Sequence, residues 1–386
     1  MIVAHEAAPG ATKARIIEHA KSLGFDLVGV APATPFLREQ AIFKDRRDRG
    51  YLGQWRYDDA TVERYCDPRA TIAQARSIIC TATSYLTADT PHDPNAPGLR
   101  GAVSSHAWGH DYHRTIHSRL LALAAHINQH HPEAASVACV DTGPLVDRAA
   151  AVRAGLGWFG KSGNVLTKQF GSYVLLGELI TTLDLEPDRP LRTHCGNCRD
   201  CIPACPTDAI GPDGAVDSRR CISDLTQLKR PIPREFRAAI GNRLWGCDSC
   251  QTSCPVNAQK SAGGAEAFRP LEHIGTSMDL TAVLHMTKRQ FREWFGPTSM
   301  AWRGKAVLQR NAAVALGNSR DERAIPHLIL ALRDRKPLVR GHAVWALGRF
   351  GTAAARAALE NLLQTELDPW VREEAEQALR SGSIAS

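Results

Sequence analysis

Cysteines are the residues of this chain whose spacing indicates chemistry most directly. Of the 11 cysteines, four form the run Cys195-x2-Cys198-x2-Cys201-x3-Cys205, and a proline follows the last of them. This is the spacing of bacterial ferredoxins, in which three thiolates of a tight loop bind one iron–sulfur cubane and the fourth binds a second one. The run therefore predicts two clusters.

A second group of cysteines completes the ligand count. We expect two [4Fe-4S] clusters, the first bound by Cys195, Cys198, Cys201 and Cys254, and the second by Cys205, Cys221, Cys247 and Cys250. Structural zinc is the alternative, but zinc sites use separated CxxC pairs, which a CxxCxxC run does not provide. Cys66, Cys80 and Cys139 lie outside these spacings, and we expect Cys80 and Cys139 to be inert thiols in buried strands.

The stretch AGLGWFGKSG, residues 154–163, satisfies two nucleotide-binding patterns at once, GxGxxG and GxxxxGKS. Both patterns need a strand before the glycines and a helix after them, because the helix N-terminus supplies the amides that hold phosphate. Here a helical pattern precedes the glycines and a strand pattern follows, so we expect neither motif. A plain turn and a loop that another molecule approaches both remain open, and Lys161 could hold a phosphate or an amide oxygen.

Polar side chains add further candidates. Asp141, in the stretch VDTG, follows a predicted strand, a common place for catalytic groups in open sheets, so a general acid and a cap or turn residue both remain open. The sequence has no second VDTG, which an aspartic protease would need. Four histidines recur every three or four residues, and we expect them to share a polar helix face rather than a metal: His106, His110, His113 and His117.

The elements that must position these residues fall into four parts. We predict an α/β domain at 1–190, a ferredoxin-type domain at 191–258, a connecting segment at 259–300 and a helical repeat domain at 301–386. Hydrophobic periodicity in the first part predicts strands at 26–31, 75–85, 135–141 and 172–182, and helices at 13–25, 110–130 and 143–155. Near the end, NAAVALGN recurs as HAVWALGR and, more weakly, as EEAEQALR, with corresponding alanines (Ala312, Ala343, Ala375) and leucines (Leu316, Leu347, Leu379) spaced by 31 and 32 residues. This period is typical of HEAT-type repeats, and so few repeats should pack on the preceding domains.

Composition and charge limit the class of protein. The chain is 44% hydrophobic and 23% charged, and it has no apolar run of the roughly 18 residues that a membrane helix needs. The start lacks a signal-peptide pattern, so we expect a cytoplasmic protein with reduced thiols. The formal net charge is +7, with Lys and Arg in excess at 219–243 and 300–345, which allows an acidic partner such as nucleic acid.

Taken together and in order, motifs along nearly the whole chain resemble those of the epoxyqueuosine reductases. The stretches that carry the likeness are LGFDLVGVAPA, ARSIICTATSY, AWGHDYHRTI, VDTGPLVDRAAAVRAGLGWFGKSGNVL, GSYVLLGEL, RRCISDLT, IGNRLWGCDSCQTSCPVN and LQRNAAVALGN. The resemblance implies an oxidoreductase that reduces epoxyqueuosine to queuosine at the wobble position of tRNA. It implies reduced cobalamin, fed with electrons through the two clusters, and an α/β domain similar to the cobalamin-binding domain of reductive dehalogenases.

The resemblance also implies roles for single residues. Asp141 matches the family's proton donor and a cobalamin contact. The other implied cobalamin contacts are Arg64, Ser104, His106, Lys161, Asn164, Ser223, Asp248 and Ser249. This chain has GKSGN where the family has GKN, and CISDLTQL where it has CISYLTIE, so the surroundings of Asp224 and Leu228 depart from the family's pattern.

A tRNA partner gives the basic segments a role, since Lys and Arg would meet phosphates of its stem. The candidates are Lys229, Arg230, Arg303, Arg310, Arg335, Lys336 and Arg340. We also expect that an electron donor of unidentified nature serves the protein, that the protein does not bind a membrane, and that it is a monomer. Two alternatives stay open: a reductive dehalogenase that acts on a small organohalide, and an iron–sulfur electron-transfer protein without its own substrate.

Overall fold

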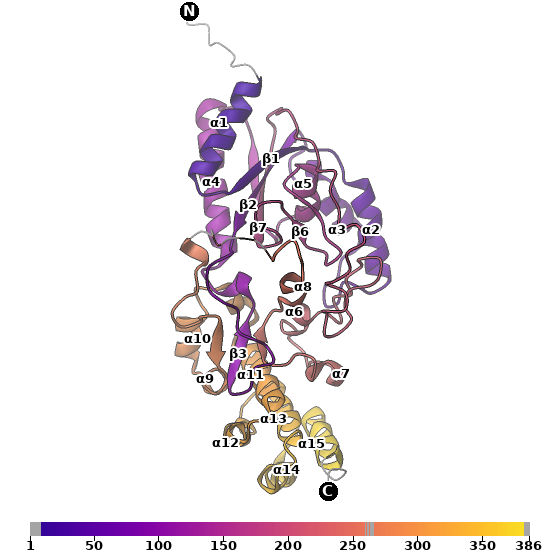
Figure 1. Cartoon of the computed structure of the whole chain (residues 1–386), viewed down its shortest axis with the longest axis vertical. Coiled ribbons are helices and arrows are strands. Elements are labelled where there is room, and N and C mark those ends of the chain that lie inside the picture. The colour runs from indigo at the N-terminus through magenta and orange to yellow at the C-terminus, as the bar shows by residue number, and fades with distance from the viewer. Residues whose placement is uncertain (1–8, 259, 261, 263–265, 382–386) are drawn as a thin grey trace, which may run out of the picture.

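The computed structural model describes residues 9–258, 260, 262 and 266–381. The outer ends of the predicted first and last domains, 1–8 and 382–386, lie outside the described residues. Figure 1 shows an elongated molecule with a sheet and its helices at the top and a stack of helices at the bottom. None of the helices in the described ranges is long and apolar enough to cross a membrane.

A four-stranded sheet forms the centre of the upper unit. Its strands lie in the order β1-β2-β7-β4, and each pairing is antiparallel. The bounds are β1 Leu27–Pro32, β2 Ser77–Ser84, β4 Ser136–Cys139 and β7 Val174–Thr181. Each strand overlaps one predicted from apolar, β-branched runs. The expectation of a buried strand is wrong for β4, since it lies at the sheet edge and exposes Val137.

Helices cover both faces of this sheet (Figure 1). Successive side chains of a strand point to opposite faces, so Ile79 packs with Ile116 and the α1/α4 side, whereas Ile78 packs with Ala150 and the α5 side. The likeness of this unit to reductive dehalogenases stays a prediction. The helical bounds are α1 Pro9–Ser22, α2 Leu37–Asp48, α3 Asp59–Cys66, η1 Pro68–Ala70, η2 Ser105–Ala107, α4 Tyr112–His130 and α5 Asp147–Arg153.

The glycine-rich stretch follows a helix and leads into strands, as predicted. Helix α5 ends before Gly155, which has a φ of +75°, and a Cβ at Gly155 would lie 2.6 Å from the carbonyl oxygen of Arg189. The chain then forms the hairpin of β5 Trp158–Phe159 and β6 Val165–Leu166. Because no helix follows the glycines, neither nucleotide-binding motif is formed.

A second sheet joins three of the predicted domains. Strand β3 Arg100–Val103 pairs in parallel with β8 Arg243–Trp245 and antiparallel with β9 Ser277–Asp279. Each strand comes from a different predicted domain, so these parts share one core. The other elements of this middle region are α6 Ile222–Leu225, α7 Arg234–Arg237, α8 Ser249–Thr252, η3 Glu266–Phe268, α9 Leu280–His285, α10 Lys288–Trp294 and η4 Ser299–Arg303.

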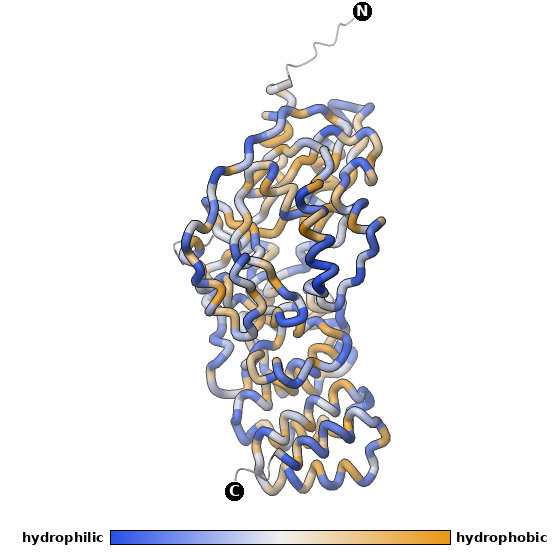
Figure 2. The backbone as a smooth tube through the Cα atoms, turned by 90° about the vertical axis from the view of Figure 1, so that its right-hand side faces the viewer, coloured by the Kyte–Doolittle hydropathy of each residue, from blue (hydrophilic) through white to orange (hydrophobic). Residues whose placement is uncertain are grey.

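The repeats form a stack of helices along which apolar and polar residues alternate (Figure 2), and their buried apolar residues belong to one core. The inner helices α11, α13 and α15 pack in succession. A Cβ at Gly317 would lie 2.7 Å from Ala346, and a Cβ at Gly348, 31 residues later, would lie 2.6 Å from Ala378. The repeated glycine thus permits close helix packing. The bounds are α11 Lys305–Ser319, η5 Glu322–Ala324, α12 Ile325–Ala331, α13 Pro337–Gly348, α14 Ala353–Thr365 and α15 Pro369–Ser381.

A buried ion-pair network fixes the repeats to the middle region, as expected for so short a solenoid. Glu374 of α15 accepts hydrogen bonds from Arg237 of α7 at 2.7 and 2.8 Å and from Arg234 at 2.7 Å. The side chains of Glu374 and Arg237 are 7% and 2% exposed. Two arginines therefore compensate one buried carboxylate at this junction.

Candidate active site

The cysteines of the ferredoxin-type segment influence one another electrostatically. Burial raises the pKa of the Cys201 thiol, and Cys195, Cys254 and Cys198 raise it further. Burial raises the pKa of Cys221 to about 11, with smaller contributions from Cys247 and Cys205. Burial also raises the pKa of Cys250, and its first thiol neighbours are Cys247 and Cys221. Most of these influences stay within the predicted ligand sets, but Cys201 also raises the pKa of Cys250, so the division into two sets stays a prediction; binding of iron would release the thiol protons.

Polar contacts from outside hold the cysteine loops in place. Lys161 donates hydrogen bonds of 2.8 Å to the carbonyl oxygens of Gly196 and Cys198. This leaves one N–H group of its ammonium for a cofactor. The backbone N–H of Ala209 donates to Cys205 Sγ at 3.2 Å. Hydrogen bonds to ligand sulfurs are among the features that set cluster potentials. The glycine-rich stretch therefore braces the first cysteine loop through its lysine.

A buried polar cluster lies where β3 and β8 end. The hydroxyl of Ser104 contacts Asp248 Oδ1 and, at 2.8 Å, His106 Nδ1. Asp248 Oδ2 accepts the backbone N–H of Ser105 at 2.7 Å, whereas the Ser105 hydroxyl is buried without a partner among the described residues. Burial lowers the pKa of His106, which keeps the ring neutral. Because the Ser104 hydroxyl donates to the carboxylate, His106 Nδ1 carries the proton and Nε2 is an acceptor.

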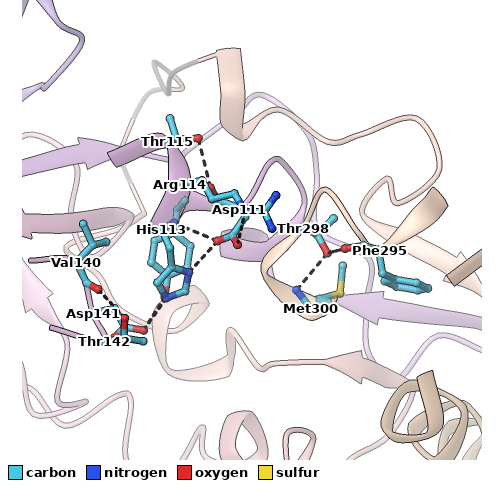
Figure 3. A network of polar contacts seen from close by, with 11 residues as sticks. Asp111, His113, Arg114, Thr115, Val140, Asp141, Thr142, Phe295, Thr298 and Met300 are labelled. Carbon is cyan, nitrogen blue, oxygen red and sulfur yellow. Dashed lines mark hydrogen bonds and ion pairs between the residues drawn. The ribbon is translucent and has the colours of Figure 1, made fainter. Parts of the chain in front are cut away.

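A second polar cluster surrounds Asp141 (Figure 3). Asp141 lies just beyond β4 with a φ of +49°. Its Oδ2 accepts a hydrogen bond of 2.9 Å from the Tyr112 hydroxyl and lies 3.2 Å from His113 Nε2. His113 Nδ1 in turn lies 2.8 Å from Asp111 Oδ1. One imidazole therefore bridges two carboxylates.

The charges of this cluster follow from its contacts. Burial opposes a charge on His113, but the hydrogen bonds to Asp111 and Asp141 prevail and raise its pKa to about 9. The hydrogen bonds from His113 and Tyr112 lower the pKa of Asp141. At neutral pH the ring is therefore an imidazolium and Asp141 a carboxylate. The Asp141 side chain is 54% exposed, so an incoming molecule can reach it.

The expectation that four histidines share one helix face is wrong. His106 belongs to η2, His110 lies in the following loop, and α4 begins only at Tyr112. The Asp111 side chain caps this helix by accepting the backbone N–H of His113. A shared period of three to four residues therefore reflects a turn followed by a new helix.

The remaining predicted cobalamin contacts are dispersed around these clusters. Arg64 is exposed on α3, and Ser223 lies on α6 directly after Cys221. Ser249 accepts a hydrogen bond of 2.8 Å from Arg243. Asn164 lies in the β5–β6 hairpin, where its amide is 3.9 Å from Cys250 Sγ.

The prediction that Arg310 binds tRNA is wrong, whereas the role predicted for Arg340 stays a prediction. Arg310 is 0% exposed and donates to the carbonyl oxygens of Arg230, Leu225 and Thr226, so it stabilises the interior. Arg340 makes a two-point contact with Glu366, which leaves little of its guanidinium for phosphate. Arg303 is half-buried. The exposed members of the set are Lys229, Arg230, Arg335 and Lys336.

Sequence reasoning missed the partners of Asp141, which are Tyr112 and His113, and the contact of His113 with Asp111. The stretch HDYHRT contains a signal, since an aspartate before a helical pattern predicts an N-cap and the start of α4 at Tyr112. Nothing in the sequence pairs this turn with a residue some thirty positions later. Packing of α4 against β4 and β7 creates that proximity.

Family models match three parts of the chain. Residues 66–142 match epoxyqueuosine reductase QueG, DUF1730; residues 194–257 match a 4Fe-4S double cluster binding domain; and residues 303–380 match HEAT repeats. The second match includes all eight cysteines of the two groups. The third covers the stacked helices.

Similar proteins extend over nearly the whole chain. Epoxyqueuosine reductases of Bacillus anthracis and Bacillus subtilis are each 38% identical, over 95% of this chain and 96% and 95% of theirs. A crystal structure of epoxyqueuosine reductase with an epoxyqueuosine-modified tRNA-Tyr stem loop superposes with a TM-score of 0.92 at 36% identity, covering 97% of this chain and 100% of that one. The Streptococcus thermophilus enzyme gives 0.88 at 33% identity over 96% and 99%. By its sequence and its structure, this chain belongs to the epoxyqueuosine reductase family.

Proposed function

We propose that this protein reduces epoxyqueuosine in tRNA to queuosine. The observation that carries the proposal is the accessible Asp141–His113 pair, in which His113 holds a proton next to the carboxylate. This pair lies in a chain that matches an epoxyqueuosine reductase over 95% of its length. A related structure contains an epoxyqueuosine-modified tRNA stem loop. Extruding an unpaired loop nucleotide from the stack costs little free energy, so its base can reach a recessed site.

The reaction sets the requirements for the site. Converting an epoxide to an alkene breaks two carbon–oxygen bonds, consumes two electrons and two protons, and releases water. Iron–sulfur clusters carry single electrons, so two clusters match the electron count. The two cysteine groups would hold the clusters, and a separate protein or a chemical reductant must reduce the clusters again after each turnover.

Cobalamin is the cofactor that we propose for the chemical step. The buried cluster of Ser104, His106 and Asp248 suits a polar cofactor, because His106 Nε2 is an acceptor and the Ser105 hydroxyl is buried without a partner among the described residues. Arg64, Asn164, Ser223 and Ser249 are the further residues that we propose to hold it. When bound and reduced, cobalamin supplies a strong nucleophile for opening an epoxide.

The proton donor that we propose is the pair rather than Asp141 alone. The lowered pKa of Asp141 means that the carboxylate carries no proton at neutral pH. His113 holds the proton at Nε2, 3.2 Å from Asp141 Oδ2. As negative charge develops on the departing oxygen, Asp141 would pass on the proton that it takes from His113.

Anaerobic turnover tests the proposal. Protein reconstituted with iron, sulfide and cobalamin is given a chemical reductant and an epoxyqueuosine-containing stem loop, and nucleosides are identified by mass spectrometry. We expect queuosine only when cobalamin is present. A parallel assay with an aryl halide tests the dehalogenase alternative. Halide release without queuosine, from protein that holds both clusters and cobalamin, would reject the tRNA assignment.

A further inference from the structure

Two exposed tryptophans stack on each other between the sheet unit and the middle region. Trp55 follows α2, and Trp302 belongs to η4; they are 40% and 49% exposed. Their rings lie 5.9 Å apart, centroid to centroid, and their planes differ by 11°. The guanidinium carbon of Arg303 lies 3.5 Å from the Trp302 ring centre and 5.2 Å from that of Trp55. We call these three residues the aromatic platform.

The chain builds this platform with buried polar groups. Asp224 Oδ1 accepts hydrogen bonds from Trp55 Nε1 at 3.2 Å and Gln54 Nε2 at 2.9 Å, which fixes the first ring. Asp224 Oδ2 and the Nε and Nη2 atoms of Arg303 are buried without partners among the described residues. Unpaired buried polar atoms are costly in a folded protein. Their presence here points to a ligand that completes the platform.

The platform borders a cleft through one of its members, Trp55. Trp55, Arg56, Arg47 and Tyr57 line this cleft of about 560 Å³. Burial raises the pKa of Tyr57, and the negative charges of Tyr65 and Asp141 raise it further. The side of the platform that Trp55 forms is therefore open to a molecule that enters this cleft.

The chemistry of the platform selects the class of ligand. Parallel aromatic rings with a guanidinium are the surface on which unpaired nucleobases stack, since each base has a π-face. Lys229 and Arg230, exposed close by in the sequence after Asp224, add positive charge suited to a phosphate backbone. A lipid would need a broader apolar surface, and a peptide would need backbone partners.

We propose that the aromatic platform stacks an unpaired base of the RNA loop that carries the substrate nucleotide, while the substrate base reaches Asp141. This inference rests on the proposed function and adds to it a specific RNA contact. Stacking tolerates any base, so the platform would hold the loop open without reading its sequence.

A double-mutant cycle on RNA binding tests the platform. Trp302→Ala, Trp302→Phe and the control Leu330→Ala are compared with the wild type, using an anticodon stem loop and variants of it with one abasic position in the loop. Leu330 is 53% exposed on α12, so its removal deletes a similarly exposed apolar side chain elsewhere. Fluorescence anisotropy gives the Kd for each pair, and the bound cobalamin is quantified in every variant.

We expect Trp302→Ala to weaken binding about tenfold, as loss of one stacked base does. Trp302→Phe should restore most of the affinity, and Leu330→Ala should leave it unchanged. One abasic position should weaken wild-type binding and have no further effect in Trp302→Ala.

Three outcomes would overturn the inference. The RNA affinity of Trp302→Ala could equal that of the wild type, or the loss of affinity in Trp302→Ala could add fully to the loss caused by each abasic position. Alternatively, Trp302→Ala could lose bound cobalamin and keep its affinity for RNA. The last would assign the platform to the cofactor. Failure of the wild type itself to bind or convert the RNA would reject the proposed function, and wild-type turnover on the same RNA separates the two failures.

Discussion

At the scale of residues, two carboxylates and one imidazole decide what the exposed site can do. Asp111 and Asp141 flank His113 at 2.8 and 3.2 Å, and this arrangement stabilises the imidazolium. A lone aspartate at a strand end would be ionised at neutral pH and would have no proton to donate. The histidine therefore makes an acid–base role for Asp141 possible.

The pH dependence of turnover tests this division of roles. The pKa of His113 is raised from 6.5 to about 9, so the ring holds its proton at neutral pH and loses it as the pH rises through 9. We predict that the rate with saturating RNA falls above pH 9. In His113→Gln the rate at pH 7 should be about 100-fold lower, within the range for loss of a positioned acid, and the fall near pH 9 should disappear. An unchanged profile in this variant would remove His113 from proton transfer.

The sequence predicts the roles of some single residues better than those of others. The double-cluster segment was predictable from cysteine spacing, because loop ligation needs fixed short separations, whereas the division of its cysteines into two sets stays a prediction. Arg310 was predicted to meet phosphate, but it lies on an inner helix whose Gln309, Arg310 and Asn311 are all buried and bind backbone carbonyls. A charge pattern cannot reveal such a position, since it depends on which helix the repeat encloses.

At the scale of elements, the junction between α7 and α15 determines whether the repeats stay docked. Glu374 is the single carboxylate between Arg234 and Arg237 in this buried network. Removing one member of such a network leaves buried charges uncompensated.

Glu374→Gln should therefore lower the free energy of unfolding by about 3 kcal/mol. The matched control is Glu360→Gln, which breaks an exposed pair with Arg356 on α14 and should change stability by less than about 0.5 kcal/mol. Urea unfolding followed by tryptophan fluorescence measures both. Equal effects of the two variants would show that the junction contributes no more than a surface ion pair.

Element types and element partners differ in how far the sequence predicts them. Strand β2 and helix α4 match predicted segments, because a buried strand and an amphipathic helix leave clear periodicities. The antiparallel order β1-β2-β7-β4 was not predictable, since the partners are far apart in sequence. The same holds for the sheet that joins β3, β8 and β9.

At the scale of the whole molecule, the exposed positive charges divide between the middle region and the repeats. Lys229 and Arg230 follow α6, whereas Arg335 and Lys336 precede α13. An RNA stem that reaches from one pair to the other would extend from the middle region to the first repeats, while its loop faces the cleft.

The salt dependence of RNA binding tests this path. Each lysine or arginine that meets a phosphate releases counterions, so its loss should reduce the slope of log K against log salt by about 1. We predict this reduction for Arg335→Gln and for Lys336→Gln. Arg323→Gln on η5 is a suitable control, because Asp321 already neutralises that arginine. Slopes equal to the wild type in both test variants would exclude the repeats from the RNA path.

Queuosine formation by Asp141→Asn tests most directly whether Asp141 delivers the proton in this reaction. The variant and the wild type are brought to equal cluster and cobalamin content, and anaerobic conversion of the epoxyqueuosine stem loop is followed by nucleoside mass spectrometry. We predict rapid conversion of epoxyqueuosine by the wild type. In the variant the rate should be lower by about 100-fold or more, with RNA affinity unchanged. Conversion by Asp141→Asn at the wild-type rate would contradict this prediction.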